Sequence, residues 1–344
     1  MYLRKSLVIF AALASMNVWA TKALPDQVPV PKDNPMTPEK IELGKQLYFD
    51  PRLSIDGTIS CNSCHNVMSH GADGRPVSVG VKGQKGGRGA PTVFNSAYYT
   101  VQFWDGREVT LEDQAKGPLT NPIEMGMPNH DAVMARVKKI PGYVSAFKKV
   151  FPKDRNPVNI DNLARAIATY ERTLVTKNAP FDKFIKGDKK AMNASAQRGW
   201  KLVQEIGCTS CHAGENFAGE GFKMGEGNFQ PFPQIPGSKY DKQYNLTHDL
   251  GRYDVTKKDE DKNHWRVPTW RNIALTAPYF HNGSVKNLDE AVRVMAKAQL
   301  DADLTNKQVT DIVEFLKSLT GEIPVQTMPL LPPDVDGQTL TPEA

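Results

Sequence analysis

The sequence predicts a mostly α-helical protein of two domains in tandem, on three observations. A Cys-x-x-Cys-His motif occurs twice, at residues 61–65 and 208–212. A stripe of apolar residues at helical spacing precedes each motif, and a second stripe follows each one at a larger distance. The same order of elements occurs twice in 344 residues, which is long enough for two domains and indicates a duplicated unit.

The first twenty residues have the features of a signal peptide. Arg4 and Lys5 precede an apolar run over residues 7–13, and residues 18–20 supply a small-residue cleavage site. We therefore predict that residues 1–20 are removed on export. The run is short and no cysteine lies near the cleavage site, so we expect neither a lipoprotein nor a stable membrane anchor.

Charge and cysteine usage exclude two other classes. Loss of Arg4 and Lys5 lowers the formal net charge from +5 to +3, which does not favour nucleic acid as a partner. All four cysteines fall within the two motifs, and a histidine directly follows each pair. This pattern argues against two structural disulfides.

The two motifs predict covalent attachment of two c-type haems. Two cysteines three positions apart can form thioethers to the two vinyl groups of one porphyrin, and the next residue then binds the iron. A single Cys-x-x-Cys pair also occurs in zinc sites, but two pairs 147 residues apart (208 minus 61) do not resemble zinc spacing. A thioredoxin-like pair would need a βαβ context. The predicted attachment residues are Cys61, Cys64, Cys208 and Cys211, and the predicted iron ligands are His65 and His212.

The helices around each motif predict two cytochrome c-like domains, each wrapping one haem. The stripe before the first motif follows a helix start at Thr37 and contains Gly44, and the stripe before the second contains Gly199. A glycine there would let another helix approach closely. The closing stripes are Leu163, Ile167, Tyr170 and Leu174 in the first half, and Val309, Ile312, Phe315, Leu316 and Leu319 in the second.

A haem that only transfers electrons needs the same two strong ligands in both redox states. A methionine opposite histidine meets this need and raises the potential. Met295 and Met224 both follow the second motif, so either could lie opposite His212. Because most methionines simply fill cores, composition does not choose between them.

Five further segments resemble the bacterial dihaem cytochrome c peroxidase family, over nearly the whole exported chain. They are residues 102–107, 114–118, 265–273, 278–283 and 291–300. The resemblance selects Met295 as the second ligand of the high-potential haem. It also implies a peroxidatic, low-potential domain over residues 21–178, an electron-transfer domain over 179–321, and a tail over 322–344. This proline-rich tail is either disordered or packed on the first domain.

The resemblance implies a periplasmic enzyme, and a homodimer, that reduces hydrogen peroxide to water. Electrons from a small soluble cytochrome c or a cupredoxin would enter at the His212/Met295 haem and pass to the His65 haem. Glu124 matches the family's catalytic glutamate, Gln114 its pocket glutamine, and Trp104 the tryptophan between the haems. His281 matches a position between the domains with a structural or hydrogen-bonding role. Without the resemblance, Glu124 would be interpreted as a solvated loop carboxylate.

The sequence departs from the family at two positions. Many members have an iron-capping histidine where Val81 stands, and valine cannot bind iron. The first iron therefore rests open or with water, or His70 substitutes as its sixth ligand. The family's calcium is bound by carbonyls that match Thr276 and Pro278 and by an asparagine that falls at Gly89. Without that side chain the Ca²⁺ site either persists through carbonyls and water or weakens.

Two other functions compete. A dihaem electron carrier would need a strong sixth ligand on both irons and would have no use for Glu124. A relative that oxidises another protein's side chains, as the methylamine dehydrogenase maturation enzyme does, would have tyrosine at the position of Met295. The sequence favours the peroxidase over both.

Overall fold

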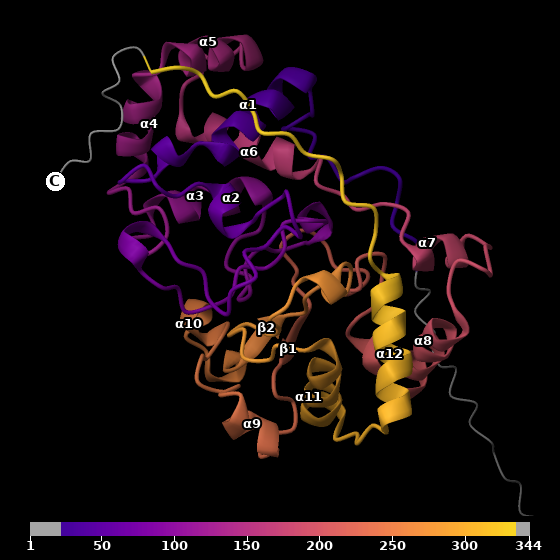
Figure 1. Ribbon diagram of the computed structural model, residues 1–344. Helices are drawn as coiled ribbons and strands as arrows, with labels where there is room; N and C mark the ends of the chain where they lie inside the picture. The colour runs from indigo at the N-terminus through magenta and orange to yellow at the C-terminus, as the bar shows by residue number, and fades with distance from the viewer. Residues whose placement is uncertain (1–21, 335–344) are drawn as a thin grey trace, which may run out of the picture.

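The computed structural model describes residues 22–334, so the predicted signal peptide and the last ten residues of the tail lie outside the described residues. The described chain is mostly helical, as predicted, and its two halves form two helical domains, one above the other in Figure 1. The helices of the first half are α1 (Pro38–Phe49), α2 (Cys61–Cys64), α3 (Leu111–Thr120), α4 (His130–Lys138), α5 (Pro141–Val150) and α6 (Ile160–Glu171).

The second half adds more helices and a small sheet. Two short strands pair antiparallel, with Phe229 opposite Arg266. The elements are α7 (Pro180–Ile185), α8 (Ala194–Ile206), β1 (Phe229–Pro231), α9 (Lys239–Gln243), α10 (Tyr253–Thr256), β2 (His264–Arg266), α11 (Leu288–Leu300) and α12 (Asn306–Ser318).

In the first domain, α1 and α6 cross at the predicted glycine. The Thr37 hydroxyl caps α1 by accepting a hydrogen bond from the Lys40 backbone N–H. A Cβ on Gly44 would collide with the carbonyl oxygen of Ala166, so only glycine allows this approach. One turn later, Tyr48 packs edge-on against Tyr170, with ring centroids 5.2 Å apart.

In the second domain, α8 and α12 repeat this crossing. A Cβ on Gly199 would collide with the carbonyl oxygen of Asp311 and would crowd Phe315. Thr305 and Gln308 form the reciprocal capping box at the start of α12. The predicted duplication is therefore confirmed at the level of helix packing.

Each half has its own buried core. In the first, one apolar cluster extends from Leu43 to Leu174. In the second, one cluster lies between Phe181 and Leu319 and another between Phe232 and Ala298. Irregular segments fill the space between the helices, as expected where a flat cofactor supplies part of the core.

Both described ends of the chain cross from one domain to the other. At the N-terminal end, the Leu24 backbone N–H donates to Asp182 in the second domain at 3.0 Å. At the C-terminal end, the tail runs over the first domain (Figure 1), where the Tyr170 hydroxyl donates to Gln326 at 2.8 Å and Lys45 donates to Thr327 at 2.9 Å.

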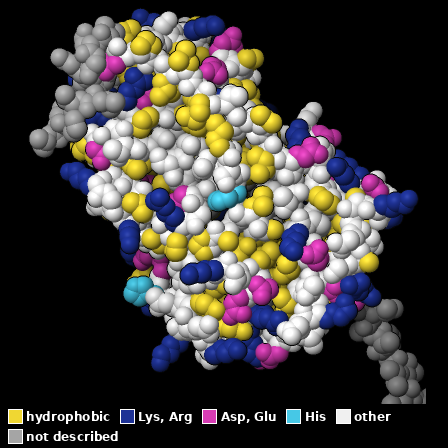
Figure 2. Space-filling model, viewed as in Figure 1, with side chains coloured by type: hydrophobic (Ala, Val, Ile, Leu, Met, Phe, Trp, Pro, Cys, Tyr) yellow, Lys and Arg dark blue, Asp and Glu magenta, His cyan; other side chains and the backbone are white. Residues whose placement is uncertain are grey.

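The surface carries charges of both signs. Figure 2 shows acidic and basic side chains mixed over the visible face, with hydrophobic side chains between them. Within residues 22–334, no helix is both long enough and apolar enough to cross a bilayer.

Candidate haem sites

The second motif follows α8 directly. Gly207 ends this helix in the left-handed conformation, with φ +98°, and residues 208–210 form a 3₁₀ turn. His212 is buried, its Nδ1 lies 3.0 Å from the Phe217 carbonyl oxygen, and its ring stacks on Trp270 at 4.3 Å. A hydrogen bond to this carbonyl leaves Nε2 free for iron. Burial lowers the pKa of His212 to about 4, which favours the neutral form that binds metals.

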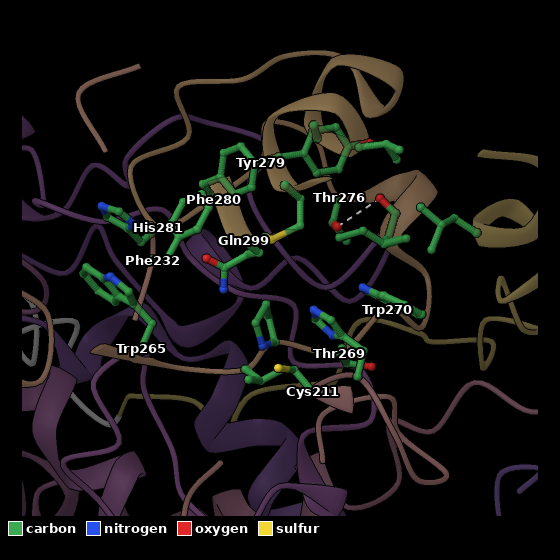
Figure 3. Close-up of a pocket in the computed structure, with 18 of the residues that line it drawn as sticks. Cys211, Phe232, Trp265, Thr269, Trp270, Thr276, Tyr279, Phe280, His281 and Gln299 are labelled. Atoms are coloured by element: carbon green, nitrogen blue, oxygen red, sulfur yellow. Dashed lines mark hydrogen bonds between the residues drawn. The ribbon is translucent and has the colours of Figure 1, made fainter. Parts of the chain in front are cut away.

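A cavity of about 410 Å³ opens beside His212. Its walls include both cysteines of the motif, and Cys211 lies across it from Tyr279 and Phe280 (Figure 3). Met295 on α11 also lines this cavity. Met224, the alternative ligand, is 54% exposed and lies outside the lining.

The residues around this cavity fit a covalently bound haem. Two cysteines, one histidine and one methionine surround a space that is otherwise walled mainly by aromatic and aliphatic side chains. This set of groups could attach a porphyrin covalently and supply a nitrogen and a sulfur ligand to its iron. Ile312 and Leu316 of α12 contribute to the apolar wall.

The first motif forms the short helix α2, which has Ser60 at its N-cap. His65 follows at the C-cap, and its Nδ1 lies 2.9 Å from the Pro91 carbonyl oxygen. The Tyr48 hydroxyl donates to the backbone oxygen of His65 at 2.7 Å. His65 is therefore oriented as His212 is, with Nε2 left for iron.

Glu124 and Val81 lie on two loops that pack together. The Val81 backbone N–H donates to the Glu124 carbonyl oxygen at 2.9 Å. A Cβ on Gly80 would collide with the Ile123 carbonyl oxygen, and one on Gly126 would lie 2.9 Å from Val81. The structure thus places Glu124 beside the loop from which the family's capping histidine would come.

The environment of the Glu124 carboxyl suits proton transfer. Burial raises its pKa above the usual range, while the Arg107 charge and a hydrogen bond from Asn121 partly oppose this. Asn121 Nδ2 donates to Glu124 Oε1 at 2.8 Å. A half-buried carboxyl that one amide holds in place can accept and return a proton within a pocket.

Gln114 lies on α3, two helical turns before Asn121 at the C-cap. Residues seven apart share a helix face, so Gln114 lies on the side of α3 that bears Asn121, the partner of Glu124. Its side chain is half-buried and makes no hydrogen bond to another described residue. Its amide is therefore free for a small polar ligand.

The structure does not bring His70 to Glu124 and Val81. A Cβ on Gly74 would lie 3.6 Å from His70 Nε2 and 4.0 Å from the Ala277 carbonyl oxygen. The His70 ring is thus on the side facing the second domain. Its Nδ1 is buried without a hydrogen-bond partner.

One backbone segment connects the two sites. The Trp104 indole N–H donates to the Gly89 carbonyl oxygen at 2.9 Å, and both residues line the second cavity. Pro91 lines this cavity too, while its carbonyl oxygen contacts His65. His281 stacks on Trp265 at 4.0 Å, and its backbone oxygen accepts a hydrogen bond from the Gly89 N–H. Trp104 and His281 therefore both lie where the domains meet.

The residues matched to the calcium site also lie at this junction. Thr276 and Pro278 both line the second cavity, and Pro278 follows Ala277 through a cis peptide bond. A Cβ on Gly89 would lie 2.9 Å from the Pro76 carbonyl oxygen. An asparagine at this position would therefore crowd the backbone of residues 75–76, which is consistent with the glycine found there.

Comparison with known proteins agrees with this geometry. A family model described as di-haem cytochrome c peroxidase matches residues 38–190. The cytochrome c551 peroxidase of Pseudomonas aeruginosa is 45% identical over 311 residues, which cover 90% of this chain and 87% of that protein. The chain belongs to the di-haem cytochrome c peroxidase family.

Other members of this family and its relatives support the assignment. The cytochrome c551 peroxidase of Nitrosomonas europaea is 43% identical over 330 residues, covering 95% of this chain and 93% of that protein. The crystal structure of a MauG-like protein associated with microbial copper homeostasis aligns with a TM-score of 0.74 at 32% identity, covering 87% of this chain and 95% of that chain. The chain is thus a di-haem oxidoreductase that acts on peroxide.

Three contributors to these sites were missed from the sequence. Pro91 acts through its carbonyl oxygen, which no side-chain pattern reveals. Asn121 lies in the same loop segment as Glu124, and its role could have been inferred from their three-residue spacing. Arg107 lowers the pKa of Glu124 from a distant segment, and only the fold brings them together.

Proposed function

We propose that this peroxidase works in the periplasm and takes electrons from a small soluble cytochrome c or cupredoxin at the haem of His212 and Met295. Electrons would pass from there to the haem of His65, where peroxide is reduced to water. The observation that carries the proposal is an asymmetry. Met295 lines the cavity beside His212, whereas the loop packed on Glu124 carries Val81 instead of a ligand.

The haem at His65 would supply a redox-active iron with a position for peroxide. Glu124 would take the proton from the oxygen that binds first and deliver it to the oxygen that leaves. The Asn121 amide fixes the orientation of the carboxyl by donating to its Oε1. The free Gln114 amide would donate to or accept from bound peroxide.

Trp104 would contribute to electron transfer between the domains. Its indole is held by the Gly89 carbonyl oxygen and lines the second cavity. Pro91, two residues further on, contacts His65. These two contacts lie within residues 89–91 of one segment, which favours a fixed distance between the two sites.

Val81 would leave the first iron ready in the oxidised protein. Valine has no atom that binds iron, and Val81 is buried with 1% exposure. His70 remains the alternative sixth ligand, but its ring faces Gly74 and not Glu124. Activity without prior reduction follows from an open iron.

Calcium and dimer formation are further parts of the proposal. The carbonyl oxygens of Thr276 and Pro278 would bind one Ca²⁺ together with water, because Gly89 supplies no side chain. The homodimer is inferred from the family. Export by residues 1–20 would place the enzyme in the periplasm.

Substitution of Glu124 tests the proposal. Glu124→Ala and Glu124→Gln should retain both haems and lose peroxide turnover by roughly two to four powers of ten, the usual contribution of a positioned acid/base. Turnover would be measured with a reduced donor, and haem content by absorbance. Glu39→Gln removes an exposed carboxylate of the same domain and is the control. Wild-type turnover in both Glu124 variants would refute the role of Glu124.

A further inference from the structure

The duplicated helix pair allows residues of the two domains to be matched one by one. Gly44 meets Ala166 and Tyr170 of α6, as Gly199 meets Asp311 and Phe315 of α12. These contacts align Tyr170 with Phe315. The next residue of each helix is then the matched pair Glu171 and Leu316.

Leu316 shows what this position faces. It lines the cavity beside His212, at the second haem site. By the same helix geometry, Glu171 faces the site of the first haem. An aliphatic side chain at the second haem is thus replaced by a carboxyl at the first.

Glu171 is deeply buried and lacks a neutralising partner. Its side chain belongs to a residue with 7% exposure, and its Oε2 makes no hydrogen bond. Arg172, its neighbour, is committed to Glu112 of α3 through two hydrogen bonds of 2.7 Å and 2.9 Å. Arg172, the cation that lowers the pKa of Glu171, is therefore largely neutralised by another carboxylate.

The titratable and charged groups that interact electrostatically with Glu171 come from four elements. They are Tyr48 of α1, Cys61 of α2, Glu112 of α3, and Tyr170 with Arg172 at the end of α6. Among ionisable neighbours, Glu171 has the largest effect in raising the pKa of the Cys61 thiol. Its carboxyl is thus within electrostatic range of Cys61, to which the first haem would be attached.

Burial raises the pKa of Glu171 to about 8; Arg172 opposes this shift and Glu112 adds to it. Ordinary glutamates titrate near 4.3. A carboxyl with a pKa in the neutral range changes its protonation when a nearby charge changes by one unit.

We propose that Glu171 couples a proton to the electron of the first haem. When one electron reduces the iron from ferric to ferrous, the Glu171 carboxylate takes up one proton from solvent, and reoxidation releases it. The reason is electrostatic, because reduction removes one positive charge that had stabilised the carboxylate. Leu316 cannot titrate, so the second haem lacks this coupling.

This inference requires a haem at His65 but not peroxide as the substrate. It can therefore fail while the proposed function stands, and it can succeed if that function fails. Its direct consequence is a midpoint potential of the first haem that falls as pH rises. For one proton per electron, each tenfold change in proton activity corresponds to ~59 mV.

The test is a spectroscopic redox titration of the intact dihaem protein, without peroxide, from about pH 6 to about pH 9, the range around the raised pKa. We expect the potential of the first haem to fall with pH in the wild type and to stay level in Glu171→Gln and Glu171→Leu. The second haem should give the same curve in all three proteins. Glu171→Leu introduces the residue that occupies the matched position in the second domain. It keeps the test valid if the amide of Glu171→Gln disturbs folding.

Glu42→Gln is the matched control, because it removes an exposed carboxylate from α1, close enough to influence Tyr170. It should keep the wild-type slope. A wild-type potential that does not change with pH would overturn the proposal. So would an unchanged slope in both Glu171 variants, since another group would then carry the proton.

Discussion

The two domains use the same helix pair to hold chemically different surroundings for the cofactor. Beside His212, the cavity is lined by Met295 on α11 and by Leu316 on α12, among others. Beside the first motif, Glu171 replaces this leucine, and Glu124 lies on a loop packed against Val81. The histidines themselves are oriented alike, with Nδ1 near the carbonyl oxygen of Pro91 in one domain and of Phe217 in the other.

This comparison shows that the scaffold does not determine the reactivity. The helix crossings at Gly44 and Gly199 are equivalent, and so are the proximal contacts. What differs is the set of side chains near each motif: Met295 lines the cavity beside His212, whereas Glu124 and Asn121 lie on the loop that packs against Val81 in the first domain. Changes confined to these few positions should therefore alter one site and leave the other intact.

The largest effect is expected from Met295→Ala, which would remove the proposed second ligand and give the second site the open position that we propose for the first. Axial ligands tune haem potentials over a range of ~0.8 V, so we expect the second potential to fall by on the order of 0.1 V. Potentiometry would measure the shift. Met224→Ala, at an exposed methionine, should change nothing. A shift in the Met224 variant instead would reverse the assignment of the ligand.

Val81→His makes the opposite change, because it gives the first site a side chain that can bind iron. We expect the oxidised variant to show a lag that prior reduction removes. If about a tenth of the oxidised molecules keep a first iron that can bind peroxide, the initial rate of turnover falls roughly tenfold. Stopped-flow assays and electron paramagnetic resonance would follow this, with Val81→Ala as the control without a ligand. An equally long lag in the wild-type protein would contradict an open first iron.

Alanine at the two crossing glycines tests whether the scaffolds are equivalent. Gly44→Ala and Gly199→Ala should each lower the free energy of unfolding by about 1–3 kcal/mol through overpacking. The helix propensity of alanine offsets at most ~1 kcal/mol of this. Denaturant unfolding followed by circular dichroism would measure both. Gly87→Ala, where a Cβ meets no atom within 4 Å, is the control. A loss of unfolding free energy in only one of the two variants would show that the two helix pairs differ.

The smallest effect concerns the pH profile of turnover. Burial raises the pKa of Glu124, and the ionised form is needed to accept a proton, so activity should rise with pH above the ordinary carboxyl range. Arg107→Gln removes a charge that lowers this pKa and should move the rise to higher pH. Steady-state rates across pH would measure this shift. A shift to lower pH would show that Arg107 does not act on Glu124 in this way.

Local patterns in the sequence predicted the parts of the fold that depend on local chemistry. The helix start at Thr37 and the close approaches at Gly44 and Gly199 follow from capping preference, helical spacing and residue size. The cavity position of Met295 agrees with the choice that the family resemblance made.

Features that depend on long-range packing could not be predicted from local sequence patterns. Nothing near Glu171 in the sequence indicates that Arg172 is occupied by Glu112, and this pairing is what leaves Glu171 without a counter-ion. The orientation of His70 toward Gly74 likewise results from how the loop after His65 folds against the second domain. These contacts join segments whose approach only the complete fold determines.

The crossing of both chain ends has a consequence for any attempt to divide the protein. Lys22 forms an ion pair with Glu220, and Leu24 bonds to Asp182, so the start of the described chain completes the second domain. Gln326 bonds to Tyr170, so the end completes the first. If the gene were divided between residues 178 and 179, each fragment would carry a chain end whose contacts are made with the other fragment. The two haem domains are duplicated as folds, but each is completed by a chain end from the other half, so we expect each half expressed alone to be less stable than the intact protein.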